Sequence, residues 1–281
     1  MAAHPWRWDV AARDVPVWGD LTSWRACFPA ADAVHILPET RCHGRPLDEA
    51  AFALLAGVRW LHVVGCNTIT DAAFVHLAGI HVLDINGCGQ LGDAAIQHVA
   101  GVQDLRMYGC TGITEAAFVH LAGVRKLELI ECPRLSDTAI EHIAGVRDLD
   151  ISSCRRITGA AFRWQCGIER LEVSDLNQDT IDDASFVHLT GVRKLVVGRC
   201  SRLTGAFMQH LDGIESLTID QCDCLTDATL AWPARRQAQH APCDELRRDH
   251  RCRLCASAIA ETPLPYEHAA CPRSPTPRWP L

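Results

Sequence analysis

A period of 22 residues runs through most of the chain and constrains its fold more than any other feature. Shifted by 22 residues, the sequence superposes on itself in eight units, of which the sixth carries two extra residues between 177 and 182. The units begin at Glu49, Asp71, Asp93, Glu115, Asp137, Gly159, Asp183 and Gly205. Such a period is typical of a stacked solenoid, in which each unit covers the apolar sides of its neighbours.

The first half of each unit predicts a short helix. In DAAFVHLAG, Ala73, Phe74 and Leu77 fall on one face at helical spacing. Thr70 can cap the start, and the acid after it favours the positive end of the helix dipole. Glycine can end a helix in the left-handed conformation at little steric cost. It stands in the ninth position of all eight units: Gly57, Gly79, Gly101, Gly123, Gly145, Gly167, Gly191 and Gly213.

The second half of each unit predicts a short strand. The pattern V-x-x-L-x-I-x-x-C-x-x-L appears, for example, from Val124 to Leu135. The alternation of Leu127 and Leu129 gives a strand with one face inward. The expected fold is therefore α/β: a solenoid of eight 22-residue repeats plus caps, with parallel strands on the concave face and short helices on the convex face.

These motifs resemble a known family. The strand half L-x-x-L-x-L-x-x-C-x-x-L-T-D is similar to the cysteine-containing leucine-rich repeat of F-box/leucine-rich-repeat proteins. The helix half T-D-A-A-F-V-H-L-A-G is similar to repeats of some bacterial proteins. The resemblance covers about residues 49–230 and implies a leucine-rich-repeat scaffold that binds another protein. Its sharper implication is the substrate-recognition subunit of an SCF-type ubiquitin ligase, with Skp1 and cullin as partners.

Residues 1–48 are expected to cap the open end of the stack. Asp20 to Cys27 predicts a helix, and Val34-His35-Ile36 a degenerate first strand. In the family, an F-box precedes the repeats, but no clear L-P-x-E-x-L opening occurs here. A truncated F-box remnant and a cap suit the apolar residues of this segment equally well, namely Trp18, Leu21, Trp24 and Phe28.

Two types of metal-ligating residue recur once per unit, and both are interpreted as scaffold. The cysteines follow the strands without any CxxC pair, which fits small buried groups better than metal ligands. The histidines stand near helix ends, and adjacent helices lie ~8–10 Å apart, too far for two rings to share a metal. The cysteines are Cys66, Cys88, Cys110, Cys132, Cys154, Cys200 and Cys222, and the histidines are His76, His98, His120, His142, His188 and His210.

The concave face is the candidate binding surface. Its middle column is acidic at Asp84, Glu128, Asp150 and Glu172. Apolar side chains gather toward its N-terminal end, at Trp60, Val64, Val82, Tyr108 and Ile130. Protein interfaces favour aromatic anchors beside charge. This pattern predicts a groove for a basic, partly apolar segment of a partner protein. The alternative is an ordinary solvated sheet face.

Residues 231–281 depart from the repeat, and two interpretations fit them. Cys252-x2-Cys255, twelve residues and then His268-x2-Cys271 suit tetrahedral zinc, with Cys243 and His250 as spare ligands. Several arginines and the prolines at 263, 265, 272, 275, 277 and 280 suit a disordered tail instead. The basic tail also offers the alternative function, binding of nucleic acid or another partner.

Composition narrows the function classes. A formal net charge of -7 argues against nucleic acid as the main ligand. No apolar run reaches the ~18 residues that span a bilayer. The N-terminus lacks the apolar core of a secretory signal, so we expect an intracellular protein, cytoplasmic or nuclear, whose thiols stay reduced. No nucleophile elbow, P-loop or dinucleotide fingerprint occurs, so no enzyme is expected, and zinc is the one cofactor considered.

Overall fold

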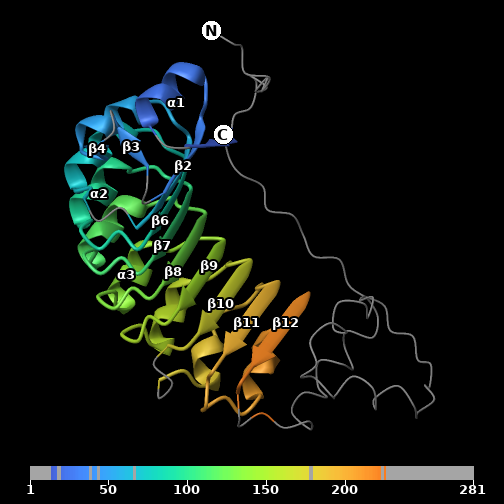
Figure 1. Cartoon of the computed structure of the whole chain (residues 1–281). Coiled ribbons are helices and arrows are strands. Elements are labelled where there is room, and N and C mark those ends of the chain that lie inside the picture. Colours follow the sequence, from blue (N-terminus) through green and yellow to red (C-terminus); the bar gives the residue numbers. More distant parts are fainter. Residues whose placement is uncertain are drawn as a thin grey trace, which may run out of the picture. The chain divides into compact units, whose positions relative to one another are not determined.

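The computed structural model describes residues 14–17, 20–37, 40–42, 45–65, 68–176, 180–222 and 225. All of them belong to the first of two compact units into which the chain divides, Met1–Ala238. Within that unit, the helices line one side of a long parallel sheet and leave the other side open (Figure 1). The open side is called the strand face below.

Ten strands form this sheet in the order β1-β2-β5-β6-β7-β8-β9-β10-β11-β12. They are β1 Asp14–Pro16, β2 Ala33–Ile36, β5 Trp60–Val64, β6 Val82–Asn86, β7 Asp104–Tyr108, β8 Lys126–Ile130, β9 Asp148–Ser152, β10 Arg170–Ser174, β11 Lys194–Gly198 and β12 Ser216–Asp220. The partner of Leu127 is Leu149. The partner of Leu171 is Leu195, two residues later than the period gives, as the insertion requires. The expected parallel sheet and its 22-residue register are therefore confirmed.

Short helices connect the strands, and most of them are 3-10 rather than α. They are α1 Leu21–Cys27, η1 Ala50–Leu55, η2 Asp71–Leu77, α2 Asp93–His98, η3 Glu115–Leu121, α3 Asp137–His142, η4 Gly159–Trp164, η5 Asp183–Phe186 and η6 Ala206–His210. The glycine in the ninth position ends each helical half with a positive φ, for example 84° at Gly79 and 89° at Gly123. The predicted left-handed helix ends are thus present in all eight units.

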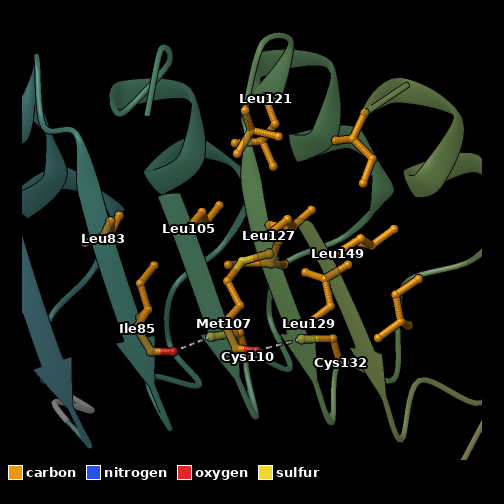
Figure 2. Close-up of a cluster of buried hydrophobic side chains, with 14 of the residues drawn as sticks. Leu83, Ile85, Leu105, Met107, Cys110, Leu121, Leu127, Leu129, Cys132 and Leu149 are labelled. Carbon is orange, nitrogen blue, oxygen red and sulfur yellow. Dashed lines mark hydrogen bonds between the residues drawn. The ribbon is translucent and has the colours of Figure 1, made fainter. Parts of the chain in front are cut away.

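The inward leucines of successive strands form one continuous core. Leu83, Leu105, Leu127 and Leu149 are fully buried and lie side by side between sheet and helices (Figure 2). Each unit contributes one layer to this interior, and no single unit has enough apolar surface to fold without its neighbours.

The cysteine column lies in the same interior, as the packing interpretation expects. The Cys110 thiol donates to the Ile85 carbonyl of the preceding unit at 3.6 Å, and Cys132 donates to Met107 at 3.7 Å (Figure 2). Burial raises the pKa of Cys110 to about 12. In the sixth unit, buried Leu176 takes the place of cysteine. Cys66 lies outside the described residues.

We expect thiol labelling to separate the column from the surface. In native protein at pH 8, iodoacetamide should alkylate exposed Cys27 and Cys166 well before Cys110, because reaction needs an accessible thiolate. Peptide mapping by mass spectrometry gives the rate at each site, and unfolded protein is the control. Alkylation of Cys110 as fast as Cys166 in the native state would contradict this packing.

The acid that begins most of the units has a role that the sequence did not reveal. The Asp93 carboxylate accepts hydrogen bonds from the N–H and hydroxyl of Thr114, the residue directly before the helix of the next unit, at 2.6 and 2.7 Å. Asp137 accepts the same pair of bonds from Thr158, at 2.7 and 2.6 Å. These carboxylates therefore link successive units on the helix side of the sheet.

The threonines that precede the helices behave in two ways. Thr114 and Thr158 cap their own helices, since each hydroxyl accepts from the backbone N–H two residues on. At Thr70 the expected cap is wrong: its side chain makes no cap bond, and its hydroxyl donates to the carboxylate of Glu49, which begins the preceding helical half.

Loss of one inter-unit link should weaken the stack. Asp137→Ala removes both bonds to Thr158 and should lower the free energy of unfolding by about 2 kcal/mol, because hydrogen bonds to a charged group are the stronger kind. Glu141→Ala, at an exposed position on the same helix α3, is the matched control. Urea denaturation followed by circular dichroism compares them, and equal stabilities would rule out the link.

The N-terminal segment forms the expected helix and strand. Asp20 caps α1 by accepting from the Ser23 N–H at 3.0 Å, and β2 pairs with β5 of the first unit. Strand β1, which pairs with β2, was not predicted. A two-stranded antiparallel ribbon, β3 Arg41–Cys42 with β4 Arg45–Pro46, follows. Leu21 and Trp24 are buried in the common core.

Candidate functional site

Three columns of side chains cover the strand face, one residue from each strand in every column. The first column includes Trp60 and Val82, the middle one Asp84 and Glu128, and the third Tyr108 and Ile130. The register therefore brings all eight predicted binding residues onto one face: Trp60, Val64, Asp84, Tyr108, Glu128, Ile130, Asp150 and Glu172.

The N-terminal end of this face holds a cluster of aromatic rings. The ring centroids of His35 and Trp60 lie 4.5 Å apart, and those of His35 and His62 lie 5.5 Å apart. The Nδ1 atoms of the two histidines are 3.4 Å apart, so one ring donates to the other. Sequence reasoning missed His35 as a surface residue. The signal was its place opposite His62 in the degenerate first strand.

The remaining apolar residues are only partly contiguous. Tyr108 and Ile130 are neighbours in the third column, but Asn86 separates them from Val64. Tyr108 is 41% exposed, and its hydroxyl interacts with Glu131, whose negative charge raises the pKa of the tyrosine. Tyr108 and Ile130 therefore form a small apolar step beside the middle column.

Most acids of the middle column already have a cation from this chain. The Lys126 Nζ lies 2.8 Å from the Glu128 carboxylate, and an Arg170 nitrogen lies 3.0 Å from Glu172. Asp84 lies 3.8 Å from His62. Burial raises the pKa of Asp84, and the nearby His62 and Arg106 partly oppose that shift. The charges of these three acids are therefore largely matched within the face.

Asp150 is different. Its carboxylate accepts a hydrogen bond from the Ser152 hydroxyl at 2.8 Å, and the described part of the chain places no cation within salt-bridge distance of it. In the register it stands between Glu128 and Glu172. Burial, more than these two neighbouring charges, raises the pKa of Asp150 to about 6.

Asp150→Asn should stabilise the fold in a pH-dependent way. The pKa of the carboxyl is about 6 in the fold and ~3.9 unfolded, so the native state loses stability as pH rises between these values. The gain from Asn should be near zero at pH 4 and about 1 kcal/mol above pH 6, after allowance for solvent screening.

Asp148→Asn is the matched control, because Asp148 pairs with Arg170 at 3.4 Å and its loss should bring no gain. Thermal denaturation of the three proteins between pH 4 and pH 8 makes the comparison. The Asp150 assignment fails if its variant shows the same difference from the natural chain at every pH.

The other candidate metal ligands are the repeat histidines and the cysteines and histidine of the tail. The six histidines of the repeat lie on the helix side, exposed or half-buried. Among the residues that the structure describes, no group of three His, Cys, Asp or Glu side chains is placed to hold a metal. Cys252, Cys255, His268 and Cys271 lie outside those residues, so zinc binding in the tail stays a prediction. No described helix is long and apolar enough to cross a membrane.

The sixth unit departs from the repeat at several positions. Trp164 replaces the repeat histidine, and the Arg163 guanidinium lies 4.0 Å from its ring centre. Gln165 replaces a buried leucine, and its amide donates to the Ile140 carbonyl at 3.1 Å. A shallow polar cavity of about 260 Å³, lined among others by Arg163 and His188, opens beside this unit on the helix side.

This architecture is a leucine-rich-repeat solenoid, and solved structures of that kind match it. A chain of the yeast Rad7–Elc1 complex is similar at 18% identity and a TM-score of 0.53, covering 66% of this chain and 56% of that one. A chain of the TLR13–ssRNA13 complex gives 15% identity and a TM-score of 0.54, with 70% and 33% covered. The mouse RP105/MD-1 complex gives 12% and 0.52, with 79% and 43% covered.

These likenesses show the fold alone, and the chain spans about half the length of the chains it matches, or less. No protein-family model matches the sequence. No curated protein matches it either.

Proposed function

We propose that this protein is an interaction scaffold whose strand face binds a partner segment carrying a basic residue beside an apolar one. The observation that carries the proposal is Asp150, a partly buried carboxylate with no described cation within salt-bridge distance; the charge of Arg170 acts on it only from farther away. Burial of an unpaired charge costs stability. A lysine or arginine from a partner would supply the missing charge.

The surroundings of Asp150 suit such a segment. Ile130 pairs with Ser152 in the register, so its side chain lies diagonally across from Asp150. Tyr108 lies beside Ile130 in the same column, one unit earlier. A basic side chain at Asp150 would therefore place its neighbours on the apolar step formed by Ile130 and Tyr108. Aromatic and apolar anchors of this kind carry most of the binding energy in protein interfaces.

The paired charges would set the orientation of the segment rather than its affinity. Glu128 with Lys126 and Glu172 with Arg170 are matched within the face and gain little from a further cation. Glu128 and Glu172 flank Asp150 on the two neighbouring strands. If the basic residue of the partner were shifted by one strand, it would meet a carboxylate that is already neutralised. Asp150 is thus the position at which one added positive charge changes the electrostatic balance most.

A finer proposal is substrate recognition for an SCF-type ubiquitin ligase. Its support is the resemblance of the repeat to that of F-box/leucine-rich-repeat proteins. A structure of similar fold is that of the Rad7–Elc1 complex, which shows that such a chain can be held in a complex with a second protein. In this proposal the strand face binds the substrate, and Skp1 and a cullin would be further partners.

Affinity purification from the cells that naturally produce the protein tests both the scaffold proposal and the ligase proposal. The tagged natural chain should recover a partner that Asp150→Lys loses, because the new charge repels the basic residue of the partner segment. Glu141→Lys makes the same charge change at an exposed position on helix α3 and should retain the partner. Asp150→Asn, which removes the charge without reversing it, should weaken recovery to an intermediate level.

The recovered partner then allows a pH test. Its affinity should fall as pH drops through about 6, where the free Asp150 carboxyl takes up a proton. Equal recovery by all variants would reject the strand face as the binding surface. Recovery of Skp1 and a cullin with every variant supports the ligase proposal. If the natural chain recovers a strand-face partner but neither Skp1 nor a cullin, only the ligase proposal is rejected.

A further inference from the structure

A second charged surface lies at the edge of the sheet where the strands end. The loops that follow β8, β9 and β11 carry five exposed arginines, which we name the arginine rim: Arg134, Arg155, Arg156, Arg199 and Arg202. The loops after β6 and β7 hold Gly89, Gln90, Thr111 and Gly112 at the corresponding places, without any charge. The positive charge is therefore confined to the later units.

The backbone of the same loops changes at the same point in the stack. The residue directly after the strand has a positive φ in all eight units. In the first three units it is Gly65, Gly87 or Gly109. From the fourth unit onward, non-glycine residues hold this conformation, with φ between 49° and 56°: Glu131, Ser153, Asp175, Arg199 and Gln221. L-residues pay an energetic cost in this region, and such positions gather at binding sites. The later units therefore carry a side chain at a backbone position that glycine would occupy with less strain.

The positive charge of the rim is only partly matched. The Asp175 carboxylate lies between two arginines, 3.9 Å from Arg155 and 4.0 Å from Arg199. The Arg156 guanidinium donates to the Arg134 backbone carbonyl, and no described carboxylate lies within salt-bridge distance of it. The other acid of the rim, Glu131, is engaged with the Tyr108 hydroxyl. Among the described loop residues, Arg134, Arg155, Arg156 and Arg199 therefore outnumber the two carboxylates, Glu131 and Asp175.

We propose that the arginine rim binds an acidic segment of a protein, a run of Asp or Glu side chains, at a site separate from the strand face. Neighbouring units lie ~4.8 Å apart at the strands, so the rim spans roughly 14 Å from the fourth unit to the seventh. An extended peptide covers that distance with about five residues at ~3.3 Å each. Guanidinium groups bind carboxylates in bidentate geometry, which fits arginine in all five places.

Two features favour an acidic peptide over a nucleic acid. Single-stranded nucleic acids bind on aromatic platforms as well as on positive charge. The described loop residues 131–135, 153–157 and 199–203 include no aromatic side chain. Beside the rim, the strand face carries Asp150, which would repel a long polyanion but leave room for a short acidic run.

Fluorescence anisotropy with fluorescein-labelled pentaglutamate and the full chain tests the proposal. Pentaglutamate should bind at low salt, and Arg134→Gln with Arg155→Gln and Arg199→Gln together should weaken binding about tenfold. The matched control changes Arg125, Arg147 and Arg193 to Gln, three exposed arginines at the opposite edge, where the strands begin. It should alter affinity less than twofold. Residues 231–281 are the same in both variants, so their contribution cancels.

The outcomes separate this site from the strand face. Asp150→Lys should leave pentaglutamate binding intact, so loss of the strand-face partner in that variant and loss of pentaglutamate in the rim variant are independent results. Equal effects of the two arginine triples, or no binding at all, would overturn the proposal. A fluorescein-labelled five-nucleotide oligouridylate is the competing probe. If it bound more tightly than pentaglutamate and the rim triple abolished that binding, the acidic peptide would be rejected as the ligand. Concentration-dependent self-association that the rim triple abolishes would assign the rim to a second copy instead.

Discussion

Parallel pairing of each strand with the strands one unit before and one unit after determines every other feature of this structure. Each strand is five residues long from β5 onward, and its leucines point into the shared interior. A slip of one residue would turn Leu127 outward and Glu128 inward, so the register has a single favourable solution. Once it is set, the residues at equivalent positions must form columns, both inside the fold and on its surface.

The columns explain why the same residue type has different consequences at different places. Cysteine in the interior column is a packing group whose thiol bonds to the preceding unit. Acids on the helix side join successive units through the helix starts. Acids on the strand face meet the charges of their column neighbours, and most find a cation there. Asp150 does not, and for that reason the proposed function depends on it.

The sequence predicts the parts of this structure that the period controls. The positions of strands, helices and left-handed glycines repeat every 22 residues, and so do the membership and order of the surface columns, because backbone geometry alone sets them. The pairing of individual side chains is not periodic and could not be predicted. Lys126 reaches Glu128 and Arg170 reaches Glu172 within one strand. These contacts depend on rotamers that a single sequence does not determine.

Two further features had a sequence signal too weak to read. Strand β1 is three residues long and follows a segment unlike the repeat, so no periodicity identified it. The inter-unit bonds of Asp93 and Asp137 involve residues 21 positions apart. That spacing is visible in the sequence, but the same acids also suit the dipole of their own helix. Only the positions of neighbouring units show that these acids bond to the next helix start as well as stabilising their own helix.

Amide hydrogen exchange measured residue by residue in solution tests the in-register stack most directly. In a strand paired on both sides, alternate amides donate to opposite neighbours, so all five amides of β8, from Lys126 to Ile130, should exchange slowly. This includes Glu128, whose side chain lies on the strand face. Rapid exchange at every second amide of β8 would mean that one neighbour is missing, and it would contradict the solenoid and both surfaces proposed on it.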